Sequence, residues 1–100
     1  MSFTRTDQGD ETTIQLSGAL DGSSAPAFHQ LADTLVAEGR HHITLDMSGL
    51  DQLDQPGVAA IMGLYKRTRQ AGGDVRIAGI RDQPLAIFKL LRYDKLFDLG

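Results

Sequence analysis

Residues 50–66 read LDQLDQPGVAAIMGLYK, in which an acid, an amide, a proline and a glycine stand directly before an apolar helix. Asp54-Gln55-Pro56-Gly57 is typical of a strand-to-helix junction, because proline fits the first helical turn and an acid stabilises the positive end of the helix dipole. A second interpretation is that a partner docks on these four residues. The junction predicts a helix from about Pro56 to Ala71 and leaves both interpretations open.

The segments on either side alternate between strand and helix patterns. Apolar residues recur at every second position in the predicted strands, and at i, i+3, i+4 and i+7 from Phe28 in the first helix. Glycines end the first two helices, at Gly39 and at Gly72-Gly73. The predicted elements are strands over 2–6 and 11–17 joined by a turn over 7–10, a helix from Ser23-Ser24-Pro26 to Gly39, a strand over 41–47, the helix from Pro56, a strand with Val75, Ile77 and Ile80, and a helix from near Pro84.

This order predicts an α/β fold in a single domain over residues 1–100. Strands that alternate with helices form parallel sheets through right-handed crossovers, and the first two strands add an antiparallel hairpin. We therefore expect a small mixed, mostly parallel four-stranded sheet with helices packed against it, in the order β-β-α-β-α-β-α. The buried side of the last helix is predicted to be either Leu85, Phe88 and Leu91 or Ile87, Leu90 and Leu91.

Composition narrows the classes of function. Hydrophobic residues make up 41% and charged residues 23%, which are ordinary globular proportions. The net charge of −3 argues against nucleic acid as the main partner, because nucleic-acid binders usually carry a basic patch. The polar start, MSFTRTDQGDETT, does not fit a signal peptide, and no apolar run of about 18 residues could cross a membrane. We expect a cytoplasmic protein without direct membrane insertion.

Motifs that carry catalysis or bind cofactors are missing from the sequence. It has no cysteine, no phosphate-binding P-loop, no Gly-x-Gly-x-x-Gly and no Gly-x-Ser-x-Gly. His41 and His42 are adjacent on a predicted strand, so they point to opposite faces and cannot easily hold one metal ion. Ser23 and Ser24 fit the start of a helix better than a catalytic site. We therefore expect no enzymatic activity, no cofactor and no metal.

The helix from Pro56 has two distinct sides. At 100° per residue, the core side holds Val58, Ile61, Leu64, Tyr65 and Thr68, and the opposite side holds Ala59, Gly63, Lys66, Arg67 and Gln70. A glycine inside a helix costs about 1 kcal/mol relative to alanine, a cost that close approach by another chain would explain. A solvated side with incidental small residues is the alternative. We favour a contact surface for a partner.

Several motifs spread along the chain resemble the STAS domain, the sulfate-transporter and anti-sigma-factor-antagonist family. The segment LDMSGLDQLDQPGVAAIMGLYKRTRQAGGDVRIAGI looks like the core of that domain. The matching residues are Gly18, Leu20 and Asp21 for the family's Gly-x-Leu-Asp, Asp46 and Ser48 for its Asp-x-Ser, Asp54 and Gly57 for the outer positions of its Asp-Ser-Ser-Gly, Gly72-Gly73 for the turn before the fourth strand, and Asp94, Lys95, Leu96 and Phe97 for the segment that closes the third helix. The resemblance covers nearly the whole chain.

The resemblance also implies a regulatory switch that this chain lacks at its usual place. In the anti-sigma-factor-antagonist branch, a partner kinase phosphorylates the serine just before the glycine, and the phosphate blocks binding. Gln55 and Pro56 occupy the two serine positions here, and neither side chain carries a hydroxyl. Pro56 stands at the phosphorylation position itself. The resemblance therefore implies a protein fixed in its binding state, or one with a partner that needs no phosphate gate at this position.

The function expected from this resemblance is a non-enzymatic regulatory module that binds a histidine-kinase-like anti-sigma factor. The predicted partner-binding residues are Asp21, Ser23, Asp54, Gln55, Pro56, Gly57, Ala59, Gly63 and Lys66. The alternative is a small cytosolic accessory subunit of a membrane transport complex. Because the chain stops at Phe97-Asp98-Leu99-Gly100, where many STAS domains add a strand or helix, we also expect exposed apolar surface near the last helix that could favour self-association.

Overall fold

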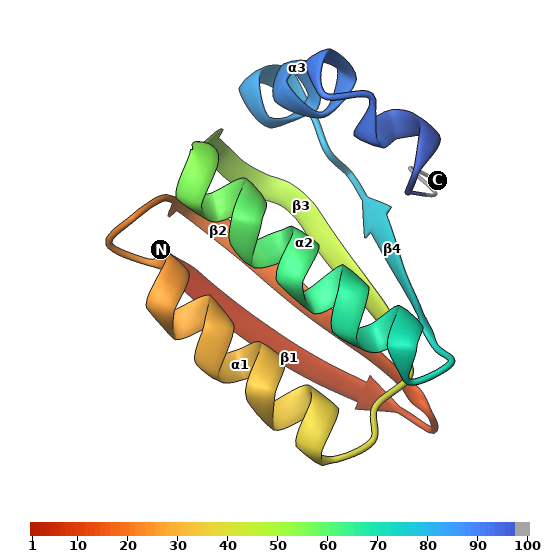
Figure 1. Cartoon of the computed structure of the whole chain (residues 1–100). Coiled ribbons are helices and arrows are strands. Elements are labelled where there is room, and N and C mark those ends of the chain that lie inside the picture. The colour runs from red at the N-terminus through yellow and green to blue at the C-terminus, as the bar shows by residue number, and fades with distance from the viewer. Residues whose placement is uncertain (98–100) are drawn as a thin grey trace.

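A computed structural model describes residues 1–97 of the chain and confirms the predicted order of elements (Figure 1). The four strands form one sheet in the order β1-β2-β3-β4, with β1 antiparallel to β2 and the other neighbours parallel. The elements are β1 (Ser2–Gln8), β2 (Glu11–Leu20), α1 (Ala25–Ala37), β3 (His42–Leu53), α2 (Gln55–Gln70), β4 (Asp74–Ala78), α3 (Asp82–Leu90) and the short 3₁₀ helix η1 (Tyr93–Lys95).

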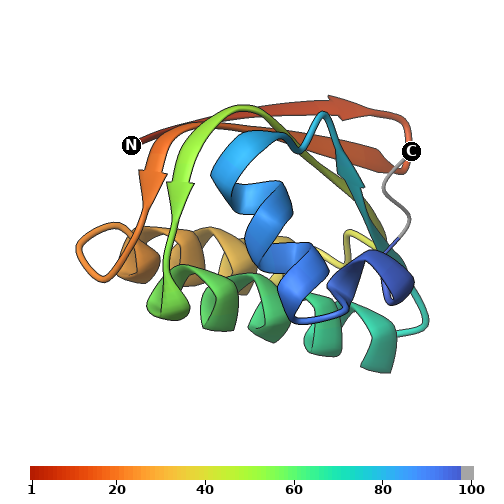
Figure 2. The ribbon, with the colours of Figure 1, turned by 90° about the horizontal axis from the view of Figure 1, so that it is seen from above.

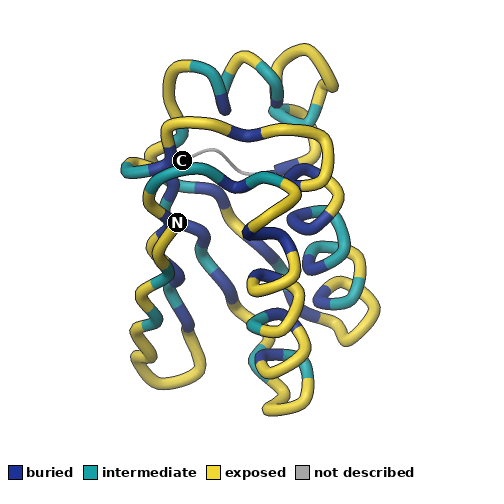
Figure 3. Tube along the Cα trace, turned by 90° about the vertical axis from the view of Figure 1, so that its left-hand side faces the viewer, coloured by how far each residue is buried: buried dark blue, intermediate teal, exposed yellow. Residues whose placement is uncertain are grey.

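The three helices all lie on one face of the sheet, which gives a two-layer α/β architecture (Figure 2). Apolar residues of the middle strands, such as Ile14 and Leu45, are fully buried and alternate with half-buried or exposed polar residues. Phe28 of α1 and Ile61 of α2 meet them from the helical layer. Buried segments of strands and helices face one another across this single core, as the dark blue parts of Figure 3 show. No helix among residues 1–97 covers the other face of the sheet.

The strand predicted over 41–47 is longer than expected, because β3 continues to Leu53. Gly49, Leu50 and Asp51 break the simple alternation of apolar and polar residues that predicted its end at Met47. In the structure, the pairing of β2 with β3 shifts register twice, between Gln15 and Ser17 and between Gly18 and Ala19. These irregularities turn the strand so that apolar residues spaced by three, Met47, Leu50 and Leu53, are all buried.

Helix α3 starts at Asp82, close to the predicted start, and its buried side agrees with the first prediction at Phe88 but not at Leu91. Phe88 is fully buried, whereas Leu90 is 78% exposed and Leu91 is 44% exposed. The chain turns at Arg92, which has a left-handed φ of 61°, and η1 then folds back toward the core. As a result Tyr93 and Phe97 contact Phe88, with ring centroids 5.7 and 5.5 Å away. These aromatic rings occupy the core position that was predicted for the leucines.

Candidate protein-binding site at the start of helix α2

Asp54 directly follows β3 and caps α2. Its backbone is extended, with φ of −119° and ψ of −175°, and its carboxylate accepts a hydrogen bond from the Gly57 backbone N–H at 3.2 Å. Pro56 follows in the first turn, where a helix needs no N–H donor. The side chains of Asp54, Gln55 and Pro56 are all exposed. The interpretation of this stretch as a helix start is therefore confirmed, and three of its four residues remain accessible to another molecule.

Gly57, the fourth residue, is buried and allows α2 to pack directly on the end of β2. A Cβ atom at this position would lie 2.3 Å from the Leu20 carbonyl oxygen and 2.9 Å from Leu53 Cδ1. Real Cβ atoms do not approach backbone oxygens so closely, so the helix could not sit here with a larger residue. Gly57 sets the position of the site and offers no side chain to a partner.

The turn between β2 and α1 lies beside the first turn of α2. A Cβ atom on Gly22 would be 3.9 Å from Pro56 Cγ, which is ordinary van der Waals contact. Asp21, half-buried, shapes this turn by accepting hydrogen bonds through Oδ1 from the Ser23 N–H at 2.9 Å and the Ser23 hydroxyl at 2.6 Å. Ser23 is exposed. The structure thus brings the predicted residues Asp21 and Ser23 close to the α2 start.

Ser24 occupies the N-cap position of α1, but its hydroxyl does not cap the helix. The hydroxyl instead donates to the Ala19 carbonyl at 2.9 Å and accepts from the Asp21 N–H at 2.9 Å. The Asp21 carboxylate accepts the Ser23 and Ser24 backbone N–H groups. Hydrogen bonds from the Ser23 hydroxyl and then from these N–H groups lower the pKa of Asp21, so this turn carries a negative charge at neutral pH.

The residues on the predicted outer side of α2 differ in their exposure to solvent. Ala59 and Lys66 are exposed, whereas Gly63 is half-buried and faces α1, where a Cβ atom would lie 3.7 Å from His29 Cε1. Arg67 forms an ion pair with Asp33 of α1 and is not directed toward a partner. This part of α2 therefore lies beside helix α1 of the same chain, and contact of Gly63 with a partner stays a prediction. Ala59 keeps its place in the site, beside Asp54 and Gln55.

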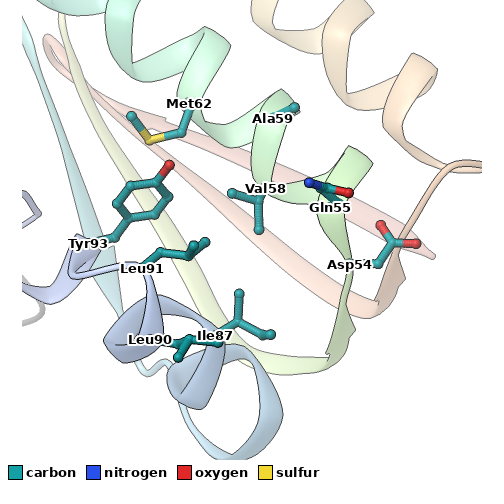
Figure 4. Close-up of a pocket in the computed structure, with 9 residues that line it drawn as sticks. All are labelled: Asp54, Gln55, Val58, Ala59, Met62, Ile87, Leu90, Leu91 and Tyr93. Atoms are coloured by element: carbon teal, nitrogen blue, oxygen red, sulfur yellow. The ribbon is translucent and has the colours of Figure 1, made fainter.

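An apolar groove that sequence analysis did not predict lies between α2 and α3, next to Asp54 (Figure 4). Its volume is about 420 Å³. The lining residues are Asp54, Gln55, Val58, Ala59 and Met62 from the start of α2, and Ile87, Leu90, Leu91 and Tyr93 from α3 and the turn after it. The sequence signal for this groove is the apolar triplet Ile87, Leu90 and Leu91, which is one of the two alternatives predicted for the buried side of the last helix.

Acids and histidines elsewhere form pairs rather than a metal site. Within residues 1–97, no three histidine or acidic side chains are grouped so that they could hold a metal ion. His42 Nδ1 lies 2.6 Å from Asp74 Oδ1, and this hydrogen bond raises the pKa of His42. Asp46 accepts the Ser48 backbone N–H and hydroxyl, which lower its pKa. His42 and Asp74 pair at the starts of β3 and β4, Asp46 and Ser48 pair within β3, and all four lie outside the groove.

Comparison with known proteins agrees with this architecture. The chain is 26% identical over 87 residues to an anti-sigma F factor antagonist from Paenibacillus polymyxa, which covers 86% of this chain and 72% of that protein. The crystal structure of an anti-sigma factor antagonist from Mycobacterium paratuberculosis superposes with a TM-score of 0.87 at 21% identity, over 98% of this chain and 83% of that chain.

A sulfate transporter family protein from Wolinella succinogenes is also similar, with a TM-score of 0.77 at 15% identity, over 95% of this chain and 75% of that chain. At these identities the two solved structures establish the fold alone. The profile of one family, described as "Mlab, STAS domain", matches residues 3–99. Because this match spans nearly the whole chain, the chain belongs to the STAS domain family.

Proposed function

We propose that this protein is a non-enzymatic, anti-sigma factor antagonist-like module that binds a histidine-kinase-like anti-sigma factor in the cytoplasm. The observation that carries the proposal is the exposed start of α2, Asp54 to Pro56, at the edge of an apolar groove. The similarity to an anti-sigma F factor antagonist supports the class of partner. No serine or threonine stands at position 55 or 56, so binding is not gated by phosphate at these residues.

The composition of the groove favours a protein as the occupant. Leu90, 78% exposed, and Leu91, 44% exposed, present apolar side chains on one wall, and Val58 and Met62 form the other. Burying such surface against a partner removes apolar area from water at about 25 cal/mol per Å². Asp54 and Gln55 at the edge supply polar groups that fix the orientation of the partner. The proposed interface therefore has an apolar centre and a polar rim.

A second candidate is an accessory subunit of a membrane transport complex. It is favoured by the structural similarity to a sulfate transporter family protein. No helix within residues 1–97 combines the length and the apolar character needed to cross a membrane, so contact with a transporter would be peripheral. Both candidates use the same surface and differ in the identity of the partner.

Photo-crosslinking in the native cells tests the proposal and separates the two candidates. A photoreactive amino acid placed at Ala59, exposed and lining the groove, should crosslink a kinase-type ATPase of the anti-sigma class. The same amino acid at Ala37, exposed at the far end of α1, is the matched control and should give no such product (Figure 1). Crosslinking of a transporter ATPase at Ala59 would favour the second candidate. Equal products at both positions would refute the assignment of the surface.

A further inference from the structure

One hydroxyl group stands beside the start of α2 even though positions 55 and 56 have none. Ser23 is exposed and follows Gly22, on which a Cβ atom would lie 3.9 Å from Pro56 Cγ. The neighbouring Ser24 is only 9% exposed, and its hydroxyl bonds to the Ala19 carbonyl, so an enzyme could not reach it without unfolding the turn. Ser23 is therefore the accessible hydroxyl of this turn.

We propose that Ser23 is a phosphate acceptor that regulates partner binding at the start of α2. This inference rests on the proposed function, because it assumes that the partner, or an enzyme that acts with it, is a kinase. The acceptor would lie on a different segment from positions 55 and 56 but on the same surface of the molecule. Chain segments far apart in sequence, the β2–α1 turn and the α2 start, would then share one regulatory site.

The transfer step uses a nucleoside triphosphate as the co-reactant. A bond forms between Ser23 Oγ and the γ-phosphorus, the bond from that phosphorus to the β,γ-bridging oxygen breaks, and a nucleoside diphosphate leaves. The hydroxyl proton starts in a 2.6 Å hydrogen bond to Asp21 Oδ1. That carboxylate is ionised at neutral pH and accepts this hydrogen bond, and the proton passes to solvent as the phosphate ester forms. The oxygen Oγ is thereby oriented by a neighbouring acid before any kinase binds.

Phosphorylation would change both the charge and the shape of the turn. A phosphoserine adds about −1.5 to −2 charges at neutral pH, and here it would lie against the ionised Asp21 carboxylate. The ester also removes the hydroxyl proton, so the 2.6 Å hydrogen bond from Ser23 to Asp21 is lost. A partner that packs over Pro56 would have to desolvate the phosphate. Each of these effects opposes binding on the proposed surface.

Ser48 provides a control with the same local chemistry at another place. Ser48 donates its N–H and its hydroxyl to Asp46 Oδ1, at 3.0 and 2.8 Å, just as Ser23 donates both to Asp21. It is also exposed, but it belongs to β3 and stands beside Gly79 rather than α2. If a neighbouring carboxylate alone determined which serine is phosphorylated, Ser23 and Ser48 would be phosphorylated to the same extent. If the position beside α2 is also required, only Ser23 is phosphorylated.

The first experiment measures where phosphate is transferred. The purified chain and its Ser23→Ala and Ser48→Ala variants are incubated with extract of the native cells and γ-labelled ATP, and the modified peptide is identified by mass spectrometry. We expect label on the unmodified chain and on Ser48→Ala, and loss of at least nine-tenths of it in Ser23→Ala. Equal labelling of Ser23→Ala, or no label on the unmodified chain, would overturn the inference.

The second experiment measures binding with phosphoserine installed during translation. Immobilised chains with serine at both positions, phosphoserine at 23 or phosphoserine at 48 are compared for retention of a kinase-type ATPase, after circular dichroism shows that all are folded. We expect at least tenfold less retention by the chain modified at 23 and unchanged retention by the chain modified at 48. Equal retention by all three would overturn the inference and leave the proposed function standing. Failure of the unmodified chain to retain such an ATPase would overturn the proposed function, and the inference with it.

Discussion

Replacement of Gly57 by alanine tests whether the close packing of α2 on β2 sets the position of the site. The added Cβ would lie 2.3 Å from the Leu20 carbonyl oxygen, which belongs to the backbone and cannot rotate away. The start of the helix must therefore move, and such overpacking costs about 1–3 kcal/mol. Alanine recovers up to about 1 kcal/mol in helix propensity. We expect a net loss of about 1–2 kcal/mol in the free energy of unfolding.

Gly63→Ala is the matched control on the same helix. Its Cβ would meet only His29 Cε1 at 3.7 Å, an ordinary contact, so the gain in helix propensity should remain. We expect Gly63→Ala to raise the free energy of unfolding by about 0.5–1 kcal/mol. Urea denaturation of both variants, extrapolated linearly to water, measures the difference. The packing argument is refuted if Gly57→Ala is as stable as the unmodified chain, or if both variants change stability in the same direction.

Three further substitutions test local features of the fold. Asp54→Ala removes the carboxylate that caps α2 and should lower the free energy of unfolding, measured by urea denaturation, by about 1 kcal/mol. Asparagine can also cap a helix, so Asp54→Asn should keep most of this stability. Thr68 is buried, and its Oγ1 has no hydrogen-bond partner among the described residues. Thr68→Val should therefore raise the midpoint of thermal unfolding. A lower midpoint would mean that the hydroxyl does form a hydrogen bond in the folded protein. The hydrogen bond to Asp74 raises the pKa of His42 in the folded state, so its contribution to stability is full below about pH 6.5 and is lost as the pH rises through the folded pKa. The stability difference between the unmodified chain and His42→Ala should therefore shrink from pH 5.5 to pH 8.5, and a difference that grows would contradict this sign.

Local patterns in the sequence were sufficient to predict the order of strands and helices. The alternation around Ile14 and Ile43 and the helical spacing from Phe28 are direct consequences of one buried face per element, and the structure confirms them. The end of β3 could not be predicted in this way. Two shifts in its pairing with β2 change which residues face the core, and such shifts depend on contacts between strands rather than on the order of residues along one strand.

The candidate site was predicted in part. The Asp54–Gly57 junction was identified because proline and glycine restrict the backbone in recognisable ways, and the structure places Asp54, Gln55 and Pro56 at the surface. The groove was missed because Leu90 has the same apolar character as a core residue. Its exposure follows from the turn at Arg92, which brings Phe97 onto Phe88. This contact between two aromatic rings across a turn leaves no periodic signal in the sequence.

The apolar surface expected near the last helix is present, since Leu90, Leu91 and Leu96 are exposed. The expectation was based on residues up to Gly100, of which 98–100 lie outside the described part of the chain. Self-association through this surface remains a prediction. Light scattering over a range of concentrations, on the unmodified chain and on Leu90→Ser, would detect it as a mass above 10.9 kDa that the substitution lowers.

The docking surface is tested most directly with the ATPase that photo-crosslinking at Ala59 identifies. This ATPase is purified, and its affinity for two arginine variants of the chain is measured. Ala59→Arg places a long charged side chain at the edge of the groove, and Ala37→Arg places the same side chain on an exposed helical position at the other end of the molecule. Isothermal titration calorimetry should show a Kd at least ten times higher for Ala59→Arg, which corresponds to a loss of about 1.4 kcal/mol in binding free energy. The Kd for Ala37→Arg should be unchanged. An unchanged Kd for Ala59→Arg, in a chain that remains folded, would contradict the placement of the partner at the start of α2.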